Sequence, residues 1–156
     1  MIARFCVDLE PRAKGRPRAA LVRGLVRVYT PSRSAKFEAS VAAAAAPHLP
    51  REVLEGPLRV DVAAITARQQ RLCRKRDPSG LLWRPQTPDA DNVRKAVLDA
   101  LKAAWRDDRQ VVAGDTLSLY AERHGRPRVV IAISRPAESP AQLVEDLGLD
   151  LGGPRD

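Results

Sequence analysis

Four aspartates occupy two short stretches of this chain, and carboxylates are the side chains that hold divalent cations. Asp89 and Asp91 form the first stretch, and Asp107 and Asp108 follow after a segment with a helical pattern. Hard cations such as Mg²⁺ take oxygen ligands, commonly one or two carboxylates with water and substrate phosphate. The chain is otherwise strongly basic, with net charge +8 and pI about 10.3. This combination indicates a metal-dependent enzyme acting on nucleic-acid phosphates.

The segment from Thr87 to about Trp105 predicts the helix that carries the first two aspartates. Thr87-Pro88 has the pattern of an N-cap with proline at the first helical position. The apolar residues form one stripe at helical spacing, namely Val93, Val97, Ala100, Leu101 and Ala104. On the opposite face Asp91, Lys95 and Asp99 stand four residues apart. Asp89 falls in the first turn, where the helix dipole favours negative charge.

Two interpretations of this polar face stay open on the sequence alone. In one, the aspartates bind a cation and Lys95 balances charge on the pentacovalent transition state. In the other, the first-turn aspartates only cap the helix, and Asp91, Lys95 and Asp99 make ordinary surface ion pairs.

Asp107-Asp108 bears on this choice because a turn is predicted there, before a strand at Val111-Val112. If that strand runs back along the helix, a carboxylate from the turn approaches Asp89 and Asp91, and the three side chains make an oxygen cage for Mg²⁺. The alternative is a plain surface turn. The sequence does not decide whether the approach occurs.

Length and charge distribution agree with one nucleic-acid-binding domain. The 156 residues, 44% of them hydrophobic, suit a single core. Residues 136–156 carry a net charge of −4, so that residues 1–135 carry +12 and attract polyanions. The excess of arginine over lysine is also explained by a GC-rich genome. No apolar run predicts a membrane span, and the N-terminus has no signal-peptide pattern.

The two cysteines do not predict a zinc site. Cys6 and Cys73 belong to no C-x-x-C pair, and their spacing to His48 and His124 matches no zinc finger or ribbon. We predict two unpaired thiols, as suits a reducing cytoplasm.

The remaining patterns predict an α+β fold with a mixed sheet and two main helices packed against it. The first helix runs from about Ser32 to before Pro47, with Thr30-Pro31 as its cap and first-turn proline. A hairpin turns at Arg23-Gly24, and Gly125-Arg126-Pro127 turns the last pair of strands. Strands are expected at residues 2–9, 21–22, 25–29, 58–65, 111–112, 117–120 and 128–133.

Residues 67–87 predict a long, mobile basic loop, and the alternative is a short basic helix with Arg68, Arg71 and Lys75 on one face. The tail from Pro136 is expected to be acidic and weakly ordered, with one helical turn.

Two longer blocks closely resemble the RusA family of Holliday-junction resolvases. They read Pro88-Asp89-Ala90-Asp91-Asn92-Val93-Arg94-Lys95-Ala96-Val97-Leu98-Asp99-Ala100-Leu101 and Trp105-Arg106-Asp107-Asp108-Arg109-Gln110-Val111-Val112. Two weaker blocks agree: Lys14-Gly15-Arg16-Pro17-Arg18 is similar to the family's basic N-terminal loop, and Tyr29-Thr30-Pro31 with Phe37-Glu38 to the segment after it. The similarity covers roughly residues 4–135. The basic stretch Arg68–Arg84 is longer than in compact members of the family, and the acidic tail is an addition. These differences leave the specificity for four-way junctions open.

This resemblance implies a homodimeric, cytoplasmic and nucleoid-associated endonuclease of prokaryotic or phage type that uses Mg²⁺, with Mn²⁺ as a substitute. It would nick two opposed strands of a four-way DNA junction. By position, the implied metal ligands are Asp89, Asp91 and Asp108, and the implied catalytic lysine is Lys95. Asp99 and Asp107 are secondary candidates, and a structural hydrogen bond to a neighbouring loop is the alternative for Asp99.

Basic residues outside the acidic stretches are candidates for contacts with DNA phosphates. They are Lys14, Arg16, Arg18, Arg68, Arg71, Arg74, Lys75 and Arg76. Two other functions remain, a non-catalytic nucleic-acid-binding protein and a small-molecule phosphohydrolase. The second lacks a glycine-rich phosphate loop.

Overall fold

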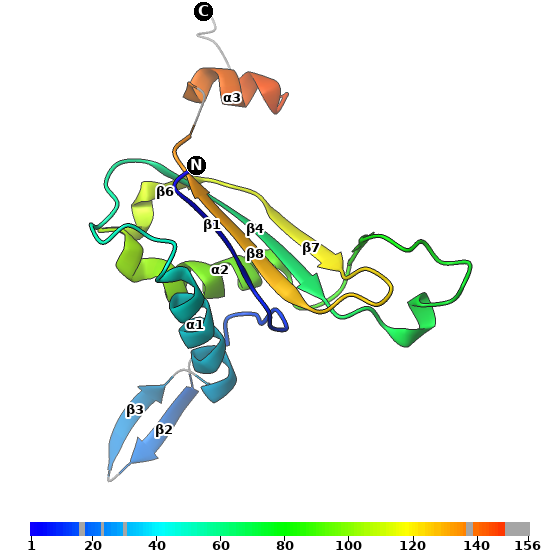
Figure 1. Cartoon of the computed structure of the whole chain (residues 1–156). Helices are drawn as coiled ribbons and strands as arrows, with labels where there is room; N and C mark the ends of the chain where they lie inside the picture. Colours follow the sequence, from blue (N-terminus) through cyan, green and yellow to red (C-terminus); the bar gives the residue numbers. More distant parts are fainter. Residues whose placement is uncertain (16–17, 23, 30, 137–138, 149–156) are drawn as a thin grey trace, which may run out of the picture.

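A mixed six-stranded sheet forms the centre of the molecule, with strand order β1-β8-β4-β7-β5 and β6 paired to the start of β4 (Figure 1). The computed structural model describes residues 1–15, 18–22, 24–29, 31–136 and 139–148. The strands of the sheet are β1 (Ala3–Val7), β4 (Leu58–Thr66), β5 (Leu82–Trp83), β6 (Val111–Ala113), β7 (Thr116–Tyr120) and β8 (Arg128–Ser134). β1 and β4 both run antiparallel to β8, whereas β6 and β7 run parallel to β4.

Two helices cover one face of this sheet, α1 (Ser32–Ala45) and α2 (Ala90–Leu101). Alternate residues of β1, β4 and β8 are buried, as expected for strands with one face on a core. The core contributed by α1 is Phe37, Val41 and Ala45, and that of α2 includes Val93, Val97 and Leu101. The predicted α+β class and the apolar stripe of the second helix are therefore confirmed.

A two-stranded hairpin, β2 (Arg18–Val22) and β3 (Leu25–Tyr29), projects from the body next to α1 (Figure 1). Gly24 has φ +77° in its turn, a conformation that glycine adopts without steric cost. The predicted hairpin is thus confirmed, although Arg23 lies outside the described residues.

The predicted range of α1, from about Ser32 to before Pro47, is confirmed, but several finer expectations were wrong. Pro31 occupies the N-cap position of α1 instead of the first helical position, and Thr30 is outside the described residues. α2 begins at Ala90, two residues after Pro88, and continues into the 3₁₀ helix Lys102–Ala104. β7 and β8 are not a hairpin pair, because β4 lies between them.

The segment 67–87 forms neither a basic helix nor a wholly irregular loop. It contains the 3₁₀ helix Gln70–Leu72 and the short strand β5, which pairs with β7. A further helix, α3 (Pro140–Asp146), follows the sheet in the C-terminal tail. Among the described residues, no helix is long and apolar enough to cross a membrane.

Candidate metal-binding and nucleic-acid-binding site

Asp89 and Asp91 lie together at the start of α2, where both side chains are exposed. Asp89 is the N-cap residue, but its side chain makes no capping hydrogen bond. The interpretation of Asp89 as a helix cap is therefore not supported. Asp91 lies in the first turn and is 3.5 Å from the Lys95 ammonium, a loose contact between two exposed side chains. Both carboxylates thus remain accessible to a cation from solvent.

Arg84 fixes the segment that precedes Asp89 and Asp91, and it is only 9% exposed. Its guanidinium donates hydrogen bonds to the carbonyl oxygens of Gln86, Thr87 and Pro88. It also donates to Ser118 Oγ on β7 at 3.3 Å. A single fixed cation therefore fastens the segment before Asp89 to the sheet, a role that the sequence had not indicated.

Arg94 connects the first turns of α2 to the sheet through β4 and β6. Its guanidinium donates to the carbonyl oxygens of Val60, at 2.6 Å, and Ala113, at 3.2 Å. Burial lowers its pKa, although Asp61 and Asp115 oppose that effect. Gly114 permits the close approach of β6 to β4, because a Cβ there would lie 1.9 Å from the Val60 oxygen. The position of α2 relative to β4 is therefore specified by polar contacts as well as by apolar packing.

Asp99 has a structural partner, Lys14. The Lys14 ammonium lies 2.7 Å from Asp99 on α2 and 2.8 Å from Glu38 on α1. Burial alone would lower the pKa of Lys14, but the hydrogen bonds to Asp99 and Glu38 raise it on balance. The Lys14 backbone N–H also donates to the Asn92 carbonyl at 3.0 Å. These contacts favour the structural alternative for Asp99, and they engage Lys14 within the protein instead of leaving it free for DNA.

Asp107 is likewise held by its neighbours. It caps the 3₁₀ helix Asp108–Gln110 in a reciprocal capping box with Gln110. Hydrogen bonds from the Arg109 side chain and backbone lower the pKa of Asp107 to about 2. Asp108 is exposed, and its Oδ1 accepts a hydrogen bond from the Trp105 indole at 3.1 Å. Of the two aspartates, Asp108 is thus the less engaged.

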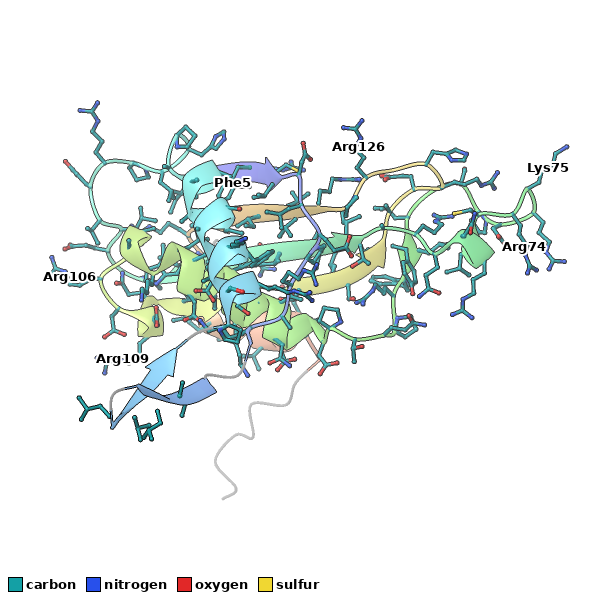
Figure 2. The ribbon with its side chains drawn as sticks, turned by 90° about the horizontal axis from the view of Figure 1, so that it is seen from below. Phe5, Arg74, Lys75, Arg106, Arg109 and Arg126 are labelled. Carbon is teal, nitrogen blue, oxygen red and sulfur yellow. The ribbon has the colours of Figure 1, made fainter. Side chains whose placement is uncertain are left out.

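The expected approach of Asp108 to Asp89 and Asp91 does not occur within one chain. Asp108 follows the C-terminal end of α2, and the 12 residues of that helix span about 18 Å. In Figure 2, Arg106 and Arg109, which flank Asp108 in sequence, lie at the opposite end of the molecule from Arg74 and Lys75. No three potential protein ligands (His, Cys, Asp or Glu) converge anywhere in the part of the chain that the structure describes.

The donor set at the start of α2 nevertheless suits a hard cation. Asp89 and Asp91 supply two carboxylates, the usual protein contribution to a Mg²⁺ site completed by water and substrate phosphate. Asp89 also borders a pocket of about 470 Å³ whose lining includes Arg84 and Ser118. A third carboxylate at Asp108 fits the same ion only if it comes from another copy of the chain.

Some of the candidate phosphate contacts are held by backbone carbonyl oxygens or carboxylates of the protein, and others are exposed cations without an ion pair among the described residues. Arg68 donates to the carbonyl oxygens of Ala121, Pro78 and Gly80, and so organises its own loop. Exposed cations remain at residues 71 and 74–76, and Figure 2 shows Arg74 and Lys75 pointing away from the body. Arg16 lies outside the described residues, and the Arg18 side chain is not described. Arg68, like Lys14, is therefore unsuited to a direct phosphate contact.

Comparison with known proteins agrees with this fold. The family model described as endodeoxyribonuclease RusA matches residues 8–134. The chain is also similar to the uncharacterized protein YqaN of Bacillus subtilis (strain 168), with 36% identity over 136 residues, which cover 83% of this chain and 94% of that protein. The chain belongs to the RusA family of endodeoxyribonucleases, and the family predicted from its sequence is confirmed.

Proposed function

We propose that this protein is a Mg²⁺-dependent endodeoxyribonuclease that resolves four-way DNA junctions by paired symmetrical nicks. The proposal rests on Asp89 and Asp91, two exposed carboxylates at one end of a basic domain of the RusA family. Asp89 makes no capping hydrogen bond and so is available to a cation. Mn²⁺ is the expected substitute. The nuclease domain comprises residues 1–135, with 67–87 as its basic loop segment and 136–156 as an acidic tail, and it acts on DNA in the cytoplasm.

The protein groups have separate roles in this reaction. Asp89 and Asp91 would hold the cation, which would supply Lewis-acid activation of water and of the scissile phosphate. Lys95 lies one helical turn from Asp91 and supplies positive charge near the phosphate as negative charge develops on it. Arg84 and Arg94 are positioning residues, because they fix the start of α2 through backbone carbonyls instead of touching the substrate.

We further infer that the ligand set is completed between two copies of the chain. A two-fold axis perpendicular to α2 reverses the helix direction, so that the C-terminal end of one copy faces the N-terminal end of the other. Asp108 of the partner subunit would then join Asp89 and Asp91, and each dimer would contain two equal sites. Two equal sites related by a two-fold axis suit symmetrical nicking of opposed strands.

A cleavage assay tests the proposed activity. Labelled four-way junction, linear duplex and single-stranded DNA are incubated with the protein, with and without Mg²⁺. We expect paired nicks in the junction alone, abolished by a chelator. Junction binding without cleavage at any Mg²⁺ or Mn²⁺ concentration would instead indicate a non-catalytic basic nucleic-acid-binding protein.

A further inference from the structure

A basic cleft lies between the end of β1 and the first half of α1, outside the cations discussed above. Its volume is about 470 Å³. Its walls carry three cations, Arg12, Arg33 and Lys36, and part of its lining is Leu9 and the buried Phe37. Arg12 belongs to the loop after β1, and the other two project from α1. Residues from separate parts of the chain thus bring three positive charges to one concavity.

These three charges form no ion pair among the described residues, and one carboxylate faces them. Arg12, Arg33 and Lys36 are exposed, and none forms an ion pair with any residue that the structure describes. The one carboxylate in the lining, Glu10, accepts a hydrogen bond from the Ala67 backbone at 3.4 Å. The cleft therefore carries a local excess of positive charge, and a concave surface concentrates the resulting field on an anion.

The cleft lies at the same end of the molecule as Asp89 and Asp91. β1 and β4 run in the same direction because both are antiparallel to β8, and Arg84 ties the segment before α2 to Ser118 on β7, which pairs with the second half of β4. The link is direct at Lys14, whose backbone N–H donates to the carbonyl of Asn92, next to Asp91. Arg12 is two residues before Lys14, so their Cα atoms are at most about 7 Å apart.

The chemistry of the cleft selects phosphate groups over bases. Arginine and lysine are the usual phosphate contacts, and the one aromatic side chain in the lining, Phe37, is only 4% exposed and cannot stack on a base.

We propose that Arg12, Arg33 and Lys36 bind backbone phosphates of the DNA arm that flanks the cut strand. The inference rests on the proposed function for its substrate, and it names the surface that carries this arm past Asp89 and Asp91. The loop at residues 74–76 then contacts a different part of the DNA, because it projects away from the body of the protein (Figure 2).

The test removes two of the three charges in the full-length protein. Arg33→Gln with Lys36→Gln retains good helix formers at exposed positions of α1. Arg4→Gln with Arg51→Gln is the matched control, since it removes the same charge at exposed sites outside the cleft. Binding to a labelled four-way junction is measured without Mg²⁺ at several salt concentrations, and thermal melting verifies that each variant is folded.

We expect the cleft variant to lose about 1.8 units of the slope of log K against log salt, or about 0.9 per phosphate contact, while the control keeps the wild-type slope. Equal slopes for the cleft variant and the control would overturn the proposal.

A parallel cleavage assay in Mg²⁺ separates the cleft assignment from the nuclease assignment. If the wild type nicks junctions while the cleft variant has an unchanged slope, the cleft assignment alone fails. If the wild type never nicks but its binding depends on the cleft, the nuclease assignment alone fails. If the wild type binds no junction, both fail.

Discussion

Replacement of Arg84 by methionine tests whether one buried cation holds the start of the acidic helix. Methionine retains an unbranched apolar stem but removes the guanidinium, which donates to the three carbonyl oxygens of residues 86–88 and to Ser118 Oγ. It also removes a cation–π contact, in which the guanidinium carbon lies 5.9 Å from the centre of the Tyr120 ring.

The expected loss follows from these contacts. A hydrogen bond to a charged group contributes about 1.5–3 kcal/mol net, but the bonds share one side chain and are not additive. Gln86 and Thr87 are exposed, so water can replace part of what their carbonyl oxygens lose. We therefore expect Arg84→Met to lower the free energy of unfolding by about 2–4 kcal/mol. Arg84→Lys keeps the charge without the planar fork, and should lose about half as much.

Urea unfolding followed by circular dichroism measures this loss. Arg74→Met is the matched control, because the Arg74 side chain is exposed on the loop and should change stability by less than about 0.5 kcal/mol. At a temperature where the protein is folded, Arg84→Met should also reduce junction cleavage more than junction binding. If Arg84→Met is as stable as Arg74→Met, or if cleavage and binding fall equally, Arg84 does not position Asp89.

Three further predictions concern the metal, the loop and pH. Asp91→Asn should abolish cleavage and leave junction binding near normal in a gel-shift assay, and surviving cleavage would exclude Asp91 as a ligand. Glutamine at residues 74–76 should reduce the salt dependence of binding by up to about 0.9 log units of slope per lost contact, and an unchanged slope would show that the loop does not touch DNA. Glu122 has its pKa lowered from 4.5 to about 2 by the Arg128 side chain. The stability from this pair is therefore present above pH 4.5 and is lost as the pH falls toward 2. Urea unfolding of Glu122→Gln should thus differ from wild type at pH 6 and converge with it near pH 2, whereas a difference independent of pH would contradict the ion pair.

The sequence predicted those helices and strands that carry a local pattern of apolar residues. The stripe Val93, Val97 and Leu101 identified α2, and the strands expected at residues 58–65 and 128–133 correspond to β4 and β8. The position of each proline relative to the helix start was less predictable, because Pro31 and Pro88 are compatible with positions outside a helix as well as with its first turn.

Features that depend on pairing between distant segments were not predictable. β5 has two residues and no periodicity of its own, and it exists because Leu82 and Trp83 pair with β7. The insertion of β4 between β7 and β8 likewise leaves no local mark in either strand.

In the candidate site, too, local features could be predicted and contacts between distant segments could not. The pairing of Asp89 with Asp91 follows from their separation by two residues, but the distance to Asp108 depends on the length and direction of α2. The basic residues could be counted from the sequence, whereas their partners could not. Lys14 and Arg68 are engaged within the fold, while Arg33 and Lys36, which sequence reasoning missed, remain free in a cleft.

A mixing experiment tests the shared metal site most directly. Asp91→Asn and Asp108→Asn proteins, each inactive alone, are mixed in equal amounts, allowed to exchange subunits and assayed on a four-way junction with Mg²⁺. Random exchange makes half of the dimers mixed, and a site shared between subunits leaves one of the two sites in each mixed dimer intact. Our account predicts that about a quarter of the wild-type sites recover, with single nicks as the main product. If the mixture stays as inactive as its components although mixed dimers form, the three aspartates do not act together across two subunits.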